Sequence, residues 1–145
     1  MFKNVLIVCV GNVCRSPVAE ELFRHHVRSR RTRFASAGLG ALVGNPMDPL
    51  AQRVLREHGV APGNHVARQV DTRMLHVADL ILAMETPHIV RLRQQAPEIH
   101  GRVFLLGKWL NDMQIPDPFR QPREVFEEVH ELLEKSVRSW LPYLT

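Results

Sequence analysis

Residues 8–17 read Val8-Cys9-Val10-Gly11-Asn12-Val13-Cys14-Arg15-Ser16-Pro17, and they connect two elements of different kinds. Before them, a continuous apolar run at 5–8 predicts a strand that is buried on both faces. After them, a helical pattern begins at Ser16-Pro17, and proline is favoured in the first turn of a helix. A short loop from a strand into a helix N-terminus gathers backbone N–H groups and the positive end of the helix dipole. The sequence therefore predicts an anion-binding loop, in which Arg15 can hold two oxygens of a tetrahedral anion.

The rest of the chain alternates between strand and helix patterns. Strands are expected at 4–10, 33–38, 79–84 and 102–107, and helices at 16–27, 49–58, 71–76, 85–95 and 123–141. This order predicts an α/β fold of one domain, residues 1–145, with a four-stranded parallel sheet and helices on both of its faces. Ligands of such sheets bind outside the carboxyl ends of the strands, where residues 8–17 lie. Gly38, Glu85 and Asp117 follow other strands and are expected near the same rim.

The composition limits the classes of function. The chain has 145 residues, of which 45% are hydrophobic and 23% charged, as in ordinary globular proteins with a full core. No apolar run approaches the ~20 residues that cross a bilayer, and the apolar run that ends at Cys9 is too short for a signal peptide. We therefore expect a cytoplasmic protein without membrane insertion.

The net charge of +4 raises the question of a nucleic-acid ligand. The basic residues cluster at 24–33, where no aromatic residue is interleaved and no groove-reading motif is present. We interpret this segment as the solvated end of a helix, whose cations suit the negative end of the helix dipole. A docking patch for an acidic partner protein is the second interpretation. Nucleic acid is the third, and we do not expect it as a partner.

Both cysteines of the chain, Cys9 and Cys14, lie within residues 8–17. A disulfide framework would join distant segments, so these thiols are expected to be reactive rather than structural. The loop N–H groups and Arg15 are expected to lower the pKa of Cys9 below its usual value of about 8.5, and the Ser16 hydroxyl can donate to the thiolate. The loop then holds a nucleophile inside an anion site, which suits attack on phosphorus.

Two further residues are expected to shape the loop. Gly11 permits a backbone turn that other residues resist, and Asn12 tolerates the left-handed conformation and can anchor the loop through its amide. A Walker-type nucleotide loop is excluded, because the loop ends in Arg15-Ser16 rather than in lysine followed by serine or threonine.

Transfer of a phosphoryl group also requires a proton donor for the leaving oxygen. Asp117 is a candidate because it lies between two prolines in a late loop, although an aspartate before proline is also common in simple turns. The eight histidines form no ligand-like cluster with the cysteines, and most of them are expected at the surface. We therefore expect no metal.

These features together resemble one family, the low-molecular-weight protein tyrosine phosphatases. The resemblance covers nearly the whole chain and is carried by residues 8–17, Ser36-Ala37-Gly38, His65-Val66-Ala67-Arg68-Gln69, Met84-Glu85 and Asp117-Pro118-Phe119. It implies the fold of that family and an enzyme that hydrolyses phosphotyrosine without a metal or another cofactor.

The resemblance also implies a role for each matching residue. Cys9 would be the nucleophile that forms a phosphocysteine, Arg15 the phosphate clamp, and Asp117 the general acid and then the general base. The implied supporting network is Asn12, Ser16, Ser36 and His65. The implied substrate-binding residues are Val10, Gly11, Asn12, Val13, Cys14, Arg15, Leu42 and Phe119. Cys14 would form a reversible disulfide with Cys9 and protect it from over-oxidation.

Two positions depart from the family pattern. Phe119 stands where many members carry tyrosine or tryptophan, and Leu42 stands on the opposite wall of the cleft, which is often aromatic in animal members. A phenyl ring can still stack on Phe119, but a less aromatic pocket is expected. Within the family, the sequence is most similar to bacterial members that dephosphorylate autophosphorylating tyrosine kinases of exopolysaccharide or capsule export. The resemblance thus implies such a kinase as the phosphotyrosine protein substrate, and a monomer or weak dimer.

Other activities of related proteins remain as alternatives. Arsenate reductases of this fold use an additional pair of cysteines far downstream, and this chain has none after Cys14. Protein arginine phosphatases of the family carry threonine at the position of Val13, and an apolar side chain there favours phosphotyrosine. A phosphocysteine carrier or a binding-only relative has little need of both Arg15 and Asp117, so these two alternatives rank lowest.

Overall fold

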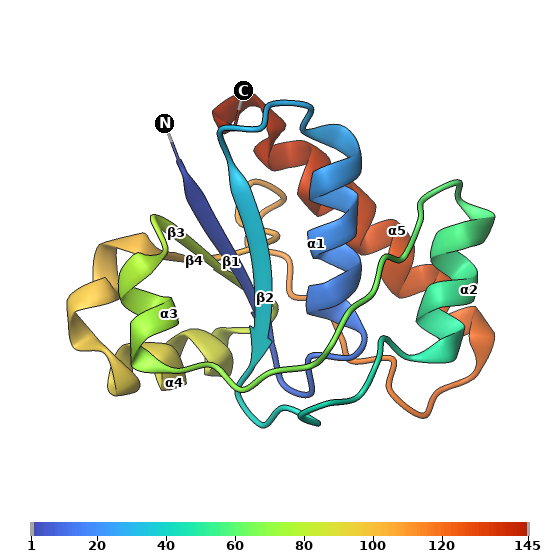
Figure 1. Ribbon diagram of the computed structural model, residues 1–145, viewed down its shortest axis with the longest axis horizontal. Helices are drawn as coiled ribbons and strands as arrows, with labels where there is room; N and C mark the ends of the chain where they lie inside the picture. Colours follow the sequence, from blue (N-terminus) through green and yellow to red (C-terminus); the bar gives the residue numbers. More distant parts are fainter. Residues whose placement is uncertain (1, 145) are drawn as a thin grey trace.

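Figure 1 shows the computed structural model of the protein, which describes residues 2–144. Four parallel strands form one sheet in the order β2-β1-β3-β4. The strands are β1 (Asn4–Cys9), β2 (Arg33–Gly38), β3 (Leu80–Ala83) and β4 (Val103–Leu105). The predicted four-stranded parallel sheet is confirmed, and β1, β3 and β4 are shorter than the predicted ranges.

Helices cover both faces of the sheet, as predicted. The helices are α1 (Arg15–His26), α2 (Pro49–Glu57), α3 (Thr72–Val77), α4 (Thr86–Gln95) and α5 (Arg123–Trp140), with short 3₁₀ turns at Pro97–Arg102 and Leu141–Tyr143. Figure 1 shows α1 and α5 on one side of the sheet, with α2 packed beyond them, and α3 and α4 on the other side. Two aspartates cap helices of this layer arrangement, since the side chain of Asp48 at the start of α2 accepts from Leu50 N and that of Asp71 at the start of α3 accepts from Met74 N.

The central strand β1 is buried on both faces, which explains why its sequence does not alternate between apolar and polar residues. Val5 and Ile7 pack into the hydrophobic cluster under α1 and α5, whereas Leu6 and Val8 pack into the cluster under α3 and α4. All four side chains are buried. A strand with two buried faces must be apolar at every position. The apolar sequence of β1 is therefore that of an interior strand of the sheet.

The carboxyl end of β1 is tied closely to its neighbour β2. Cys9 is opposite Gly38, and the N–H groups of Leu39 and Gly40 donate to the carbonyls of Cys9 and Val10. A Cβ atom on Gly38 would lie 2.3 Å from the carbonyl oxygen of Val10, so any larger residue would push the two segments apart. The loop after β1 is therefore held against β2 by a backbone contact that requires glycine.

The basic segment 24–33 is only partly the solvated helix end that was predicted. Arg24 donates to Glu21 Oε1 at 2.7 Å and to the carbonyl oxygen of Phe34 at 2.7 Å, so it joins the end of α1 to β2. Arg28, Arg30 and Arg31 are exposed. Between residues 2 and 144, none of the helices combines the length and the apolar character that spanning a membrane requires.

Candidate active site

The candidate site lies where β1 turns into α1, at the carboxyl end of the sheet. Cys9 ends β1 and Arg15 begins α1, as predicted for an anion-binding loop. The predicted role of Gly11 in the turn is wrong, because its φ is not in the left-handed region and a Cβ there would make only ordinary contacts. The residue of this loop that adopts the left-handed conformation is Asn12, at φ 60°, and asparagine was expected to tolerate that conformation.

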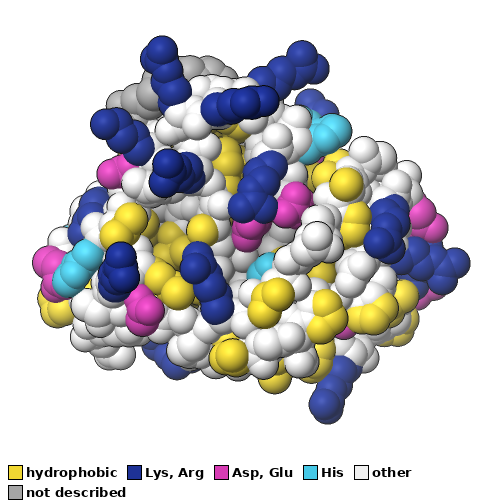
Figure 2. All heavy atoms as spheres, viewed as in Figure 1, with side chains coloured by type: hydrophobic (Ala, Val, Ile, Leu, Met, Phe, Trp, Pro, Cys, Tyr) yellow, Lys and Arg dark blue, Asp and Glu magenta, His cyan; other side chains and the backbone are white. Residues whose placement is uncertain are grey.

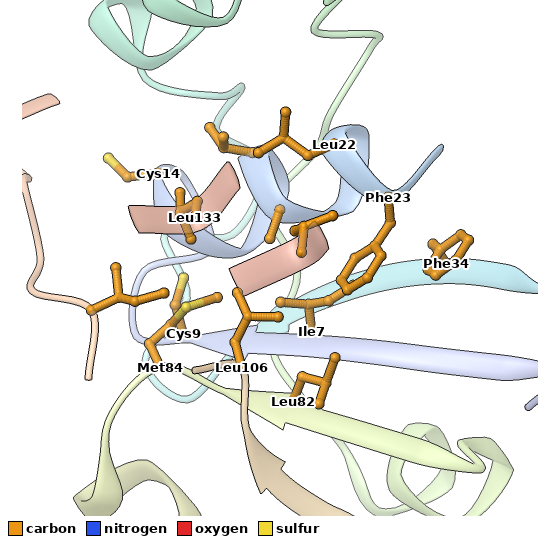
Figure 3. Packing of buried hydrophobic residues seen from close by; sticks show 14 of the residues in the cluster. Ile7, Cys9, Cys14, Leu22, Phe23, Phe34, Leu82, Met84, Leu106 and Leu133 are labelled. Atoms are coloured by element: carbon orange, nitrogen blue, oxygen red, sulfur yellow. The ribbon is translucent and has the colours of Figure 1, made fainter. Parts of the chain in front are cut away.

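Cys9 lies at the bottom of the loop and is 2% exposed. Figure 3 shows it beside Met84 and Leu106 at the end of β1. Its Sγ lies 2.9 Å from Ser16 Oγ, and Asn12 Nδ2 donates to that same Oγ at 2.8 Å. A Cys9 thiolate has no proton of its own, so the Ser16 hydroxyl is then the donor, and Asn12 fixes the position of its oxygen.

Asn12 connects this hydroxyl to the surrounding elements. Its Nδ2 also donates to Ser36 Oγ at 3.0 Å, and its Oδ1 accepts from the backbone N–H of Arg68 at 3.0 Å. His65 Nε2 lies 2.6 Å from the Asn12 carbonyl oxygen, so a ring proton on Nε2 donates there. The structure thus brings together all four residues of the expected network, from the loop after β1, from α1, from β2 and from the segment before α3.

Arg15 is 1% exposed, and its contacts orient the guanidinium. Nη1 donates to Glu85 Oε2 at 2.7 Å and to the carbonyl oxygen of Ile115 at 2.8 Å. Nε has no hydrogen-bond partner, and Nη2 lies 3.7 Å from Asp117 Oδ2. One edge of the guanidinium is therefore occupied by the protein, and the Nε–Nη2 edge remains for two oxygens of an anion.

Asp117 lies on the rim, and its side chain is 46% exposed. Its Oδ1 accepts from the backbone N–H of Phe119 at 3.0 Å. This hydrogen bond forms a simple turn of the kind that is common where aspartate precedes proline. Its Oδ2 is the oxygen nearer to Arg15 Nη2. The turn therefore fixes one carboxylate oxygen and leaves the other facing the site.

A cavity of about 160 Å³ opens above the loop. It is lined by Cys9, Val10, Gly11, Val13, Cys14, Arg15, Gly40, Leu42, Asp117 and Phe119. Every expected substrate-binding residue is among them except Asn12, whose side chain is fully buried on the protein side of the loop. Gly40 also lines the cavity and was not predicted. The walls are largely apolar, and the Arg120 guanidinium stacks on the Phe119 ring at 5.4 Å from its centroid.

The second thiol has different surroundings from Cys9. Cys14 is buried, and in Figure 3 its sulfur points away from Cys9. Burial raises the pKa of the Cys14 thiol well above its usual range, and the charges of Asp48 and Asp117 act in the same direction. Cys14 therefore remains a protonated thiol at neutral pH, and both cysteines are free in the structure.

Two residues of the site were not predicted as site residues. Glu85, expected only near the rim, forms the ion pair with Arg15, and His88 Nε2 lies 3.4 Å from the same Glu85 oxygen. Burial, followed by the charge of Arg15, lowers the pKa of His88, so the ring is neutral beside Glu85 at neutral pH. Four of the eight histidines are exposed, fewer than predicted, while His26 and His65 are half-buried and His88 and His130 are buried. In residues 2–144, no three His, Cys, Asp or Glu side chains are grouped to hold a metal ion.

Comparisons with a family model and with known proteins identify the same family. Residues 4–145 match the family model described as low molecular weight phosphotyrosine protein phosphatase. The chain is 51% identical over 141 residues to the low molecular weight protein-tyrosine-phosphatase Wzb of Escherichia coli strain K12, covering 97% of this chain and 94% of Wzb.

Solved structures agree with the sequence match. The structure of Wzb from Vibrio vulnificus in complex with benzylphosphonate superposes with a TM-score of 0.94 at 36% identity, covering 99% of this chain and 100% of that chain. The YwlE arginine phosphatase of Geobacillus stearothermophilus superposes with a TM-score of 0.91 at 30% identity, covering 97% of this chain and 92% of that chain. The anion loop, the parallel sheet and these matches lead to one conclusion: the chain belongs to the low molecular weight phosphotyrosine protein phosphatase family.

Proposed function

We propose that this chain is a protein-tyrosine phosphatase, and that Cys9, Arg15 and Asp117 carry the reaction through a phosphocysteine. One observation carries the proposal: a sulfur nucleophile, a guanidinium and a carboxylate line a single cavity of about 160 Å³. The proposed catalytic domain extends over residues 1–145, and the family match covers 4–145.

In the first step, Cys9 Sγ attacks phosphorus, and an S–P bond forms as the bond from phosphorus to the tyrosine oxygen breaks. Arg15 Nε and Nη2, together with loop N–H groups from Val10 to Arg15, hold the non-bridging oxygens and balance their charge. Asp117 donates its proton to the departing tyrosine oxygen, so that phenol rather than phenolate leaves. The free Oδ2 of Asp117 on the cavity side supports this role.

In the second step, water attacks the phosphorus of the phosphocysteine, and Asp117, now ionised, accepts a proton from that water. The S–P bond breaks, and its electron pair returns to Cys9 as a thiolate. The Ser16 hydroxyl, 2.9 Å from the sulfur, donates to this thiolate and so stabilises the leaving group. Arg15 and the loop N–H groups supply the positive charge in both steps, so we expect that chelators leave the rate unchanged.

The shape of the cavity supports phosphotyrosine as the substrate. Leu42 and Phe119 provide apolar walls for a phenyl ring, and Val13 lines the cavity without a polar group. Phosphoarginine is the second candidate, because a related arginine phosphatase shares 30% of the sequence and the fold. A guanidinium beside Val13, Leu42 and Phe119 would lose its hydrogen bonds to water, so we expect phosphotyrosine to be preferred.

The partner and the setting of the enzyme also belong to this proposal. We propose a cytoplasmic monomer or weak dimer whose substrate is a phosphorylated bacterial tyrosine kinase of polysaccharide export. The support is the similarity to Wzb, named as a protein-tyrosine-phosphatase. Cys14 is proposed to form the reversible disulfide with Cys9 during oxidation.

The test of the proposal is a comparison of three reactions under one set of conditions: release of phosphate from phosphotyrosine, release of phosphate from phosphoarginine, and reduction of arsenate. We expect phosphotyrosine turnover that persists in EDTA and that Cys9→Ser abolishes. Faster turnover of phosphoarginine, or loss of activity in EDTA, would contradict the proposal.

A further inference from the structure

A second hollow lies on the sheet face that carries α3, next to the edge strand β2. Its volume is about 390 Å³, and its floor is formed by Leu6 and Ala35 of the sheet with Met74 and Val77 of α3. Figure 2 shows hydrophobic side chains in a hollow between α3 and β2, with Lys and Arg side chains around it. Val77 is 55% exposed, so part of this apolar surface faces solvent.

The rim of this hollow carries an excess of positive charge. Arg33, Arg68 and Arg73 line it, and the single carboxylate among the lining residues is Asp71, whose Oδ1 already caps α3. Within residues 2–144, none of the three arginines forms an ion pair with a carboxylate. We call this hollow, with its four floor residues and three arginines, the basic groove.

The neighbouring edge of β2 is closed to the addition of another strand. Its outward carbonyl oxygens at Phe34 and Ser36 accept hydrogen bonds from Arg24 Nη2 and Arg68 Nε. These carbonyl oxygens are therefore not free to accept main-chain hydrogen bonds from an added strand. The open surface is the sheet face, where an occupant must bind through side chains. Carboxylates suit the arginine rim, and an apolar side chain suits the floor.

We propose that the basic groove docks an acidic segment of the phosphoprotein whose phosphotyrosine enters the active site. This inference rests on the proposed phosphatase function. Arg68 links the two places, because its backbone N–H donates to Asn12 Oδ1 under the active-site loop and its side chain lines the groove. Val5 and Cys9 are four residues apart on β1, which is about 13 Å along the strand.

A single extended peptide can therefore reach both places. At about 3.3 Å per residue, four residues cover the strand separation, and the path around the rim needs several more. The active-site cavity has room for little beyond the phosphate and its ring, so flanking residues of the substrate must make their contacts elsewhere on the surface. Contacts in the basic groove would add affinity without touching the reacting atoms.

The test uses phosphotyrosine peptides of one length, each with the same block of acidic residues and one leucine. The block is placed four to six, seven to nine or ten to twelve residues from the phosphotyrosine, on either side, and a peptide with neutral residues in the block is the reference. For the wild-type enzyme we expect one spacing to lower KM by roughly ten-fold, with kcat unchanged. If no spacing changes KM, the docking proposal is wrong.

A pair of charge-reversal variants then locates the effect. R33E/R73E alters two groove arginines whose side chains have no other described partner, and R28E/R56E changes the net charge equally at exposed arginines outside the groove. We expect R33E/R73E to abolish the preference for the acidic peptide and R28E/R56E to retain it. Equal loss in both variants would mean long-range attraction rather than docking, and would overturn the proposal.

Two controls separate this inference from the phosphatase function itself. Both double variants should hydrolyse p-nitrophenyl phosphate and the neutral peptide at the wild-type rate, and should unfold at the wild-type temperature. If the wild-type enzyme fails on the neutral phosphotyrosine peptide, the proposed function fails, not the docking. If anionic lipid vesicles bind in place of the acidic peptide and only R33E/R73E loses that binding, the groove is a membrane site, and the proposal of a peptide is wrong.

Discussion

Glu85 Oε2 lies 2.7 Å from Arg15 Nη1, and this ion pair sets which edge of the guanidinium faces the active-site cavity. The carbonyl oxygen of Ile115 accepts from the same nitrogen, so Nη1 is held by two acceptors. The Nε–Nη2 edge is thereby directed to the place where a phosphate would bind. Glu85 thus acts on substrate through Arg15, and its contribution can be measured without removing the arginine.

We expect Glu85→Ala to lower kcat/KM for phosphotyrosine by about 10²-fold, because a misdirected guanidinium no longer meets the transferring phosphoryl group. Glu85→Gln should recover part of the loss, since its amide oxygen can still accept from Nη1. Steady-state kinetics of the two variants, with circular dichroism to verify folding, checks this. Equal activity of Glu85→Ala and the wild type would show that Ile115 alone is enough to orient Arg15.

Ser16 is expected to matter most in the step that regenerates the thiolate. Ser16→Ala removes the hydroxyl 2.9 Å from Cys9 Sγ, and a hydrogen bond to a charged group contributes about 1.5–3 kcal/mol. Turnover should slow by roughly ten- to a hundred-fold, and phosphocysteine should accumulate. Acid quenching followed by mass spectrometry of the intact enzyme measures the phosphorylated fraction. An unchanged fraction in Ser16→Ala would remove Ser16 from the second step.

The differing surroundings of the two cysteines predict different reactivity. Burial raises the pKa of Cys14, so this residue is a thiol at pH 7, and alkylation requires the thiolate. Iodoacetamide should therefore label Cys9 before Cys14, as peptide mapping will reveal. Cys14→Ser should retain activity but lose recovery by dithiothreitol after peroxide treatment, if Cys14 protects Cys9 through a disulfide. Full recovery in Cys14→Ser would contradict that protective role.

The strand–loop–helix unit could be predicted from sequence because its determinants are local. The apolar run before Cys9 and the helix start at Ser16-Pro17 fixed its position, and the order of strands and helices placed it at the carboxyl rim. The two flanking prolines in a late loop also indicated Asp117 from local sequence. Its catalytic role was implied by the family resemblance and is part of the proposed function. These features need only neighbouring residues and the rule for parallel sheets.

Contacts between distant segments could not be predicted in the same way. Glu85 and Arg15 are 70 residues apart, and their contact depends on the pairing of β1 with β3, which brings the residues that follow the two strands to the same rim of the sheet. The turn was assigned to Gly11 because glycine is the usual choice, but the hydrogen bonds of Asn12 stabilise the left-handed conformation at the next position. A propensity for one residue type cannot reveal which of two neighbours has tertiary partners.

His130 is expected to make the stability of the fold depend on pH. Burial lowers its pKa, and the nearby His58, stacked on it with ring centroids 4.0 Å apart, acts in the same direction. The unfolded chain therefore binds a proton at a higher pH than the folded chain does. Stability is complete above the unfolded pKa of about 6.5 and decreases as the pH falls below it.

A substitution of this ring isolates its part in the pH dependence. His130→Gln should flatten the fall in the free energy of unfolding between pH 6.5 and 5, as measured by urea titration at each pH. His100→Gln, at an exposed histidine, is the matched control and should leave the slope unchanged. Parallel slopes for His130→Gln and the wild type would assign the acid sensitivity to other groups.

The role of Asp117 as a proton donor predicts a dependence on the leaving group. Tyrosine is a weak acid with a pKa near 10, so its oxygen leaves slowly unless it is protonated, whereas p-nitrophenol is more acidic and leaves readily as the anion. Asp117→Asn keeps an oxygen that can accept from Phe119 N but cannot donate the carboxylic proton. We expect the rate of the first step to fall by about 10²–10⁴-fold for phosphotyrosine and far less for p-nitrophenyl phosphate. Single-turnover measurements isolate that step from the hydrolysis of the phosphocysteine. If both substrates slowed equally, Asp117 would position the loop rather than donate a proton.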